Sequence, residues 1–78
     1  MSDHRVKRVA ALRDQLARAD LDALLVTSLP NIRYLTGFSG SNALLVVSAR
    51  DCLLFTDFRY ATQVSDEVGN HATVRIEP

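Results

Sequence analysis

Residues 43–56, ALLVVSARDCLLFT, are the stretch that decides the fold. They hold two apolar runs, 43–48 and 52–56, separated only by Ala49, Arg50 and Asp51. A parallel pair of strands needs a crossover connection of a dozen or more residues, which three residues cannot supply. The two runs are therefore predicted to be the strands of an antiparallel hairpin.

Upstream of this hairpin, residues 4–18 have the pattern of an amphipathic helix. Apolar residues spaced by three, three and four positions form one stripe along it, at Val6, Val9, Leu12 and Leu16. Ser2 or Asp3 is the expected N-cap, and the helix is expected to end at Ala19 and Asp20. The intervening Arg5 and Arg8 are predicted to face water.

Residues 21–27, LDALLVT, contain a continuous apolar run that is too short for a stable helix of its own. Such a run is typical of a strand buried on both faces, and Leu25 is expected in the core. A short helix over 32–36 follows, with Asn31 as its N-cap and Gly37 in the left-handed conformation after it. Residues 38–42 are rich in turn formers and are predicted to be a loop.

After the hairpin, a helix is expected over 58–67, capped by Asp57 or Thr56, and then a strand over 73–77. The result is an α/β fold with a mixed sheet in the order 3-2-1-4, strand 2 antiparallel to its neighbours and helices on its faces. Strand 4 would lie at an apolar edge, which natural domains usually cover. We therefore expect the chain to be the front part of something larger.

The composition limits the classes of function. The chain has 78 residues, 47% of them apolar, and nine Lys and Arg balance nine Asp and Glu. Zero net charge argues against a nucleic-acid partner or a polybasic membrane anchor. No signal peptide or run of about 18 apolar residues is evident, and the single Cys52 excludes an internal disulfide. These features predict a soluble, cytoplasmic protein.

The residues show no self-contained catalytic constellation. His4 and His71 have no carboxylates at ligand spacing, and Cys52 starts an apolar strand, where a buried thiol is inert. The Gly37–Asn42 segment matches neither a nucleophile elbow nor a phosphate-binding loop. Asp57 and Arg59 at a strand-to-helix junction are interpreted as a structural cap and an ion pair.

Two separated stretches resemble one protein family. Asn31 to Phe38, NIRYLTGF, is followed by a loop of small residues, and Leu54 to Tyr60 reads LFTDFRY. Both are similar to markers of the N-terminal domain of the creatinase, prolidase and Xaa-Pro aminopeptidase family. The resemblance covers roughly residues 5–77 and implies a ribonuclease H-like fold.

The resemblance also implies a function for a longer protein. Family members usually carry a C-terminal catalytic domain of pita-bread fold, which binds two divalent metal ions, manganese being expected, and hydrolyses the bond before proline. That domain is absent here, so residues 1–78 are expected to be a partial N-terminal domain, with no cofactor and no activity alone.

In the family, the N-terminal domain supports assembly into homo-oligomers, and its loop approaches the active site of another subunit. Carried over to this chain, the resemblance assigns the shaping of a substrate site to Phe38, Ser39, Gly40, Ser41 and Asn42. The expected partners are the catalytic domain and another subunit. The alternative is a stand-alone oligomerisation or binding module that has no peptidase partner.

Overall fold

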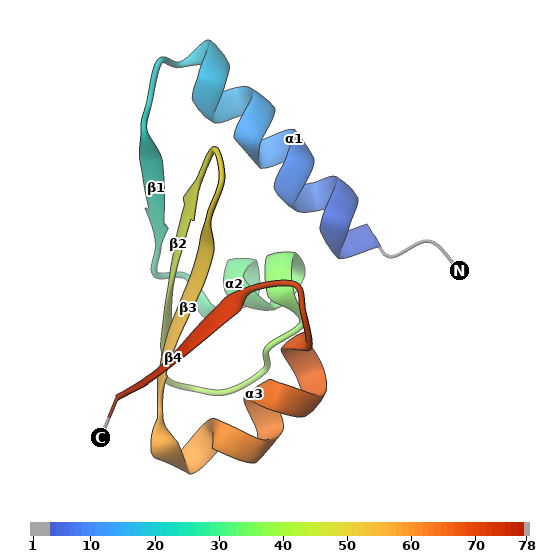
Figure 1. Ribbon diagram of the computed structural model, residues 1–78, viewed down its shortest axis with the longest axis vertical. Coiled ribbons are helices and arrows are strands. Elements are labelled where there is room, and N and C mark those ends of the chain that lie inside the picture. The colour runs from blue at the N-terminus through green and yellow to red at the C-terminus, as the bar shows by residue number, and fades with distance from the viewer. Residues whose placement is uncertain (1–3, 78) are drawn as a thin grey trace.

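The computed structural model describes residues 4–77 as one layer of helices packed on one sheet (Figure 1). Along the chain the elements are α1 (His4–Arg18), β1 (Ala23–Val26), α2 (Leu29–Thr36), β2 (Ala43–Ser48), β3 (Cys52–Asp57), η1 (Phe58–Tyr60), α3 (Ala61–Val68) and β4 (Thr73–Glu77). The helix over 4–18, the hairpin and the strand over 73–77 are confirmed.

The four strands form one mixed sheet in the order β1-β2-β3-β4. β2 is antiparallel to β1 and to β3, as predicted, whereas β4 is parallel to β3. The predicted order 3-2-1-4 is wrong, because β4 lies beside β3 and not beside β1. Residues 58–72 supply a crossover long enough for a parallel pair, and strands that follow one another along the chain usually lie side by side.

This order makes β1 an edge strand. Only Val26 of β1 is buried, and Leu25 is 58% exposed. The prediction of a central strand buried on both faces is therefore wrong. β4 forms the other edge, as expected.

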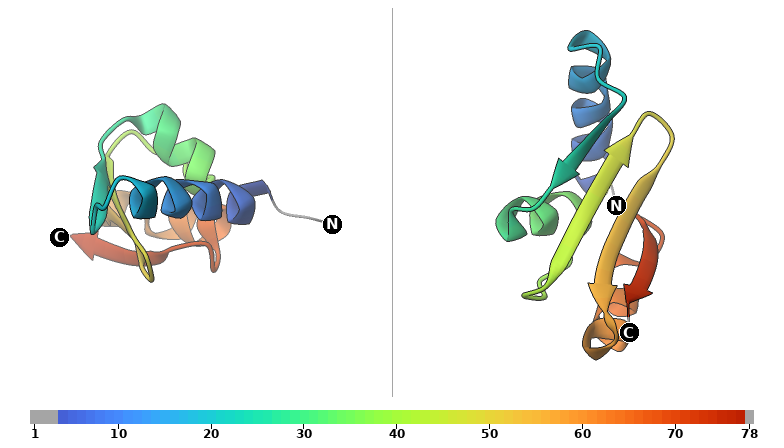
Figure 2. Two further views of the ribbon diagram at one scale, coloured as in Figure 1. Left: turned by 90° about the horizontal axis from the view of Figure 1, so that it is seen from above. Right: turned by 90° about the vertical axis from the view of Figure 1, so that its left-hand side faces the viewer.

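All the helices of residues 4–77 lie on one side of the sheet, and the core fills the space between them (Figure 2). The strands alternate accordingly: Leu45 and Val47 of β2 point into the core, whereas Leu44 between them is 45% exposed. The largest fully buried side chains are Phe38, Ile32, Leu45, Leu54, Val47, Val64, Val68 and Thr36. The predicted mixed sheet flanked by helices is confirmed, and the helices of residues 4–77 lie on one side of it.

Two helix details differ from the predictions. α2 begins at Leu29 with Ser28 as its N-cap, three residues before the predicted Asn31, because Pro30 is well suited to the first turn of a helix. In α1 the apolar stripe is narrower than predicted, since Val6 is 60% exposed. The predicted N-caps, Ser2 and Asp3, lie outside the described residues.

Two turn predictions are confirmed. Gly37 has φ 87° and its N–H donates to the carbonyl of Arg33, which ends α2. Asp20, after α1, has φ 57°, also in the left-handed region. Together these turns direct the chain from each helix back to the sheet.

Candidate functional site

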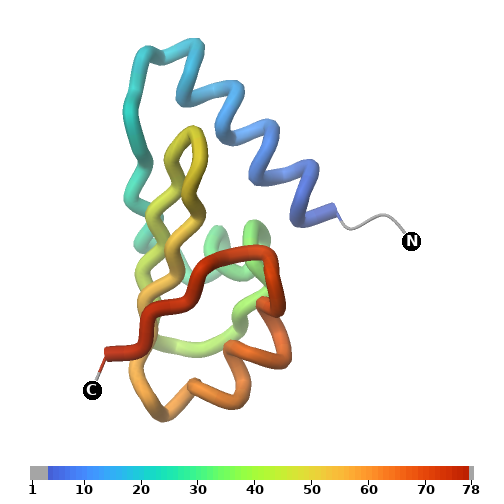
Figure 3. The backbone as a smooth tube through the Cα atoms, viewed as in Figure 1, coloured from blue at the N-terminus to red at the C-terminus, as the bar shows by residue number. Residues whose placement is uncertain are grey.

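The 38–42 loop joins α2 to β2 and passes alongside α3 (Figure 3). Gly37 begins the loop, because its left-handed conformation turns the chain out of α2. Three sets of contacts, from α3, η1 and the end of β3, hold the loop in place. The two stretches that carry the family resemblance therefore meet in space.

Phe38 and Gly40 anchor the loop to the core. The Phe38 ring is 1% exposed and meets the Tyr60 ring edge to face, with 5.5 Å between centroids and 87° between planes. A Cβ at Gly40 would overlap the Phe38 ring, so this position requires glycine for close approach. The exposed part of the loop is consequently Ser39, Ser41 and Asn42.

Glu67 of α3 binds the first exposed residue of the loop. The Ser39 N–H donates to Glu67 Oε1 (2.9 Å) and the Ser39 hydroxyl donates to Oε2 (2.7 Å). Gln63, one turn earlier, donates from Nε2 to Ser39 Oγ and to Glu67 Oε1, each at 3.1 Å. The Ser39 amide is the main cause of the lowered pKa of Glu67, followed by its hydroxyl.

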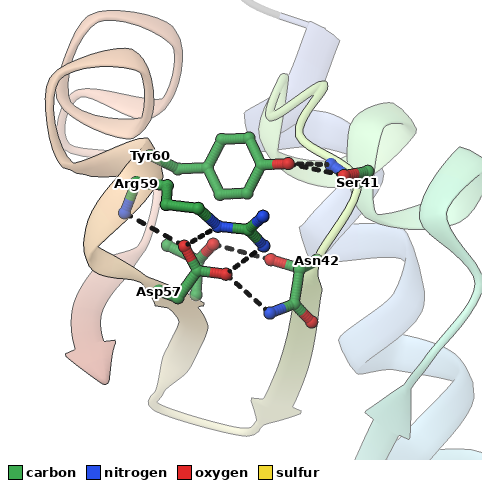
Figure 4. Close-up of polar contacts among 6 residues, drawn as sticks. Ser41, Asn42, Asp57, Arg59 and Tyr60 are labelled. Atoms are coloured by element: carbon green, nitrogen blue, oxygen red, sulfur yellow. Dashed lines mark hydrogen bonds and ion pairs between the residues drawn. The ribbon is translucent and has the colours of Figure 1, made fainter. Parts of the chain in front are cut away.

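Tyr60 binds the middle of the loop. Its hydroxyl oxygen accepts from the Ser41 N–H at 3.3 Å and also shares a hydrogen bond with the Ser41 hydroxyl (Figure 4). These hydrogen bonds, the hydroxyl one first, lower the pKa of Tyr60. Tyr60 thus contacts Phe38 with its ring and Ser41 with its polar end.

Asp57 binds the end of the loop and caps η1. One carboxylate oxygen, Oδ2, accepts from Asn42 Nδ2 (2.7 Å) and from Arg59 Nη2 (2.8 Å). The other, Oδ1, accepts from Arg59 Nε (2.9 Å) and from the Arg59 backbone N–H (3.0 Å). The Arg59 and Asn42 side chains hold the pKa of Asp57 well below its usual range, and Asp57 raises the pKa of Arg59.

The geometry around Asp57 favours a positional role. The Arg59 side chain is 63% exposed, and such surface ion pairs contribute little to stability. The ion pair instead orients the site, because the bidentate contact with Arg59 fixes the Asp57 carboxylate that accepts the hydrogen bond from Asn42. Thr56 adds a hydrogen bond of 2.6 Å from its hydroxyl to the Asn42 carbonyl.

Three residues that bind the 38–42 loop or the helix ends beside it were not identified from the sequence. Glu67 and Gln63 lie 28 and 24 positions from Ser39, and only their i, i+4 spacing hints at a shared face. Arg5 was predicted to face water, but its Nη1 donates to the carbonyls of Thr36 (2.9 Å) and Glu67 (2.6 Å). Arg5 therefore ties α1 to the helix ends on either side of the loop.

The remaining candidate residues lie apart from this site. Cys52 is buried, and burial raises the pKa of its thiol. Residues 4–77 contain no group of three or more His, Cys, Asp or Glu side chains suited to hold a metal ion. In the same residues, no helix has the length and apolar character needed to cross a membrane.

An open groove of about 510 Å³ lies between α1, β1 and α2. Leu12, Leu24 and Leu35 supply apolar lining, and Arg8, Gln15 and Asn31 are among its polar side chains. None of the sequence-predicted site residues lines it.

Comparisons with known proteins agree with this architecture. The family model described as the creatinase/prolidase N-terminal domain matches residues 8–78. An uncharacterized peptidase of Bacillus subtilis (strain 168), YqhT, is 39% identical over 61 residues, which are 78% of this chain and 17% of that protein.

Solved structures show the same fold. A crystal structure of an Xaa-Pro aminopeptidase from Streptococcus pyogenes has a TM-score of 0.90 at 36% identity, covering 99% of this chain and 59% of that chain. X-prolyl aminopeptidase from Caenorhabditis elegans, described as a cytosolic enzyme with a di-nuclear active site, has a TM-score of 0.82 at 28% identity. The match covers 100% of this chain and 16% of that one.

The fold and the match over residues 8–78 define the class: the chain belongs to the creatinase/prolidase N-terminal domain family. It has the N-terminal domain fold of Xaa-Pro aminopeptidase- and prolidase-like proteins. It spans about a sixth of the length of YqhT and of the C. elegans enzyme.

Proposed function

We propose that this chain is the non-catalytic N-terminal part of a metal-dependent, cytoplasmic Xaa-Pro peptidase, either an aminopeptidase or a dipeptidase. In this proposal the 38–42 loop shapes the substrate site of a catalytic domain, and the domain supports homo-oligomerisation. Two divalent metal ions, manganese by the family resemblance, belong to the catalytic domain and not to this chain.

The preorganisation of the 38–42 loop is the observation that carries the proposal. Phe38 and Gly40 are packed against Tyr60 and the core. The remaining loop residues, Ser39, Ser41 and Asn42, are each held by a side chain from the other half of the chain. A loop held in this way can present a defined surface to a substrate without losing much conformational entropy on binding.

The loop can position a substrate but cannot cleave it. Its exposed side chains are two hydroxyls and an amide, and all three are engaged in hydrogen bonds within the domain. Their partners in these hydrogen bonds are Glu67, Tyr60 and Asp57, and none of these is a histidine that could act as a general base. Bond cleavage is therefore assigned to the catalytic domain.

The first test is the purified 78-residue chain, assayed on Xaa-Pro dipeptides and tripeptides with and without Mn²⁺. We expect no turnover in either condition. Metal-dependent hydrolysis by the pure chain would refute the non-catalytic role.

The second test uses the longer protein encoded by the gene. We expect the reading frame to continue past Pro78 into a peptidase domain whose Ser41→Trp variant has an altered KM for Xaa-Pro peptides and an unchanged metal content. Ala17→Trp, at an exposed position near the C-terminal end of α1 and away from the loop, is the control. A reading frame without a peptidase domain would favour the stand-alone binding module instead.

A further inference from the structure

Arg5, in the first turn of α1, connects the C-terminal ends of two other helices. Its Nη1 donates to the carbonyl of Thr36, the last residue of α2, and to that of Glu67, the penultimate residue of α3. The last carbonyls of a helix have no partner within it and carry a partial negative charge, so a guanidinium is favourable there. One side chain of α1 therefore fixes the end of α2 relative to the end of α3.

The two residues that Arg5 connects also hold the start of the 38–42 loop. The Thr36 hydroxyl oxygen accepts a hydrogen bond from the Phe38 N–H at 3.2 Å. The Glu67 carboxylate accepts hydrogen bonds from the N–H and from the hydroxyl of Ser39. The position of Ser39 in the loop consequently depends on where α3 ends relative to α2.

Gly37, between α2 and the loop, leaves room for the arginine. A Cβ at this position would lie 2.5 Å from Arg5 Nη1 and 3.1 Å from the Glu67 carbonyl oxygen. Glycine is thus required here for two reasons: its φ of 87° lies in the left-handed region, and the guanidinium lies against it.

We propose that Arg5 is a positioning residue of the 38–42 loop and that it acts through Glu67. By fixing the end of α3 against the end of α2, it keeps the Glu67 carboxylate within reach of Ser39. The importance of this contact for a substrate rests on the proposed function, in which the loop shapes a substrate site. Arg5 is 31 and 62 positions away from its two acceptors, so no local sequence pattern indicates the role.

Arg8 provides a matched control. It lies three positions after Arg5 on the same face of α1, and its Nη1 donates to the carbonyl of Tyr34 in the last turn of α2 at 2.9 Å. Its guanidinium also lies over the Tyr34 ring, 4.1 Å from the centroid. Replacing either arginine by methionine removes one charge and one contact with α2. Among the contacts within residues 4–77, only Arg5→Met of the two breaks the connection to α3.

Amide hydrogen exchange of the 78-residue chain, followed by NMR, tests the proposal. In Arg5→Met we expect exchange at Ser39 to accelerate several-fold, while Ser41, which Tyr60 holds, keeps its wild-type rate. In Arg8→Met neither rate should change, even though the Tm falls in both variants. Ser39 is exposed, so its amide exchanges through local opening, and a purely stabilising role of Arg5 would leave its rate unchanged.

The route through Glu67 has a test of its own. Glu67→Ala should accelerate exchange at Ser39 by itself, and Arg5→Met added to it should cause no further acceleration. Effects that multiply in the double variant would overturn this route.

A second variant keeps the proposal testable if Arg5→Met fails to fold, which circular dichroism would show. Arg5→Lys retains the charge, but its side chain is one atom shorter and ends in a compact ammonium. It should not reach both carbonyls, so exchange at Ser39 should again accelerate while exchange at Ser41 does not.

The remaining outcomes separate the positioning role from the proposed function. An unchanged rate at Ser39 in Arg5→Met, or equal acceleration at Ser39 and Ser41, would overturn the positioning role. In the longer peptidase, Arg5→Met should raise the KM for Xaa-Pro peptides with kcat and metal content unchanged, and Arg8→Met should leave the KM as it is. Accelerated exchange at Ser39 with an unchanged KM would support the positioning role and refute the substrate role of the loop.

Discussion

Leu44 and Leu45 are consecutive residues of β2 that point to opposite faces of the sheet, and they allow a sharp test of where the core lies. Leu45 is 0% exposed, whereas Leu44 is 45% exposed. Leu45→Ala removes a fully buried side chain and leaves a cavity, which costs about 2–5 kcal/mol of unfolding free energy. Leu44→Ala leaves no cavity and loses only part of a side chain's burial, roughly 1 kcal/mol or less.

These costs are large against the whole stability of the domain. At roughly 0.05–0.15 kcal/mol per residue, a chain of this length is stable by about 4–12 kcal/mol. Leu45→Ala should therefore remove a large fraction of the stability and lower the Tm by about 10 °C or more, because each kcal/mol corresponds to about 4–8 °C in a small domain. Leu44→Ala should lower it by less than about 8 °C.

Urea and thermal unfolding followed by circular dichroism measure both effects. Equal losses for the two variants would refute the assignment of Leu45 to the core side of the sheet and of Leu44 to the other side. A changed m-value would instead indicate that a variant alters the compactness of the folded or the unfolded state.

Two further predictions concern the loop contacts. Tyr60→Phe keeps the ring against Phe38 but removes the hydroxyl bound to Ser41, so amide exchange at Ser41 should accelerate several-fold while Ser39 is unchanged; equal acceleration at both would contradict separate anchors. Because the pKa of Glu67 is lowered in the folded state, ionised Glu67 stabilises the fold fully at pH values above its ordinary pKa of about 4.3. This stabilisation is lost as the pH falls through the lowered pKa. The Ser39 amide shift should titrate in that acidic window and become insensitive in Glu67→Gln; a titration that persists in this variant would assign it to another group.

The parts of the fold that depend on local sequence were predictable. The 3.6-residue period of 4–18 and the three-residue connection at 49–51 each determine one element through short-range geometry, and both predictions are confirmed. The strand order was not predictable in the same way. β3 and β4 are joined through 58–72, and the sequence alone did not distinguish a place beside β3 from a place beside β1.

The prediction that β1 is buried on both faces was wrong for a related reason. A continuous apolar run, Leu24 to Val26, is typical of a strand covered on both sides. The run predicts an apolar environment but does not say which segment supplies it. Within residues 4–77 only one side of β1 faces helices, and Leu25 is left exposed on the other.

The loop contacts follow from the hairpin that decides the fold. Ala43 pairs with Thr56, so Asn42 before β2 and Asp57 at the end of β3 reach the same end of the hairpin. That register brings Asn42 Nδ2 to within 2.7 Å of Asp57 Oδ2, and η1 then starts at once and carries Arg59 and Tyr60 back toward the loop. A one-residue slip in the register between β2 and β3 would turn Leu45 out of the core and would also separate Asn42 from Asp57. The burial of Leu45 in the core thus also holds the 38–42 loop in register with the residues that bind it.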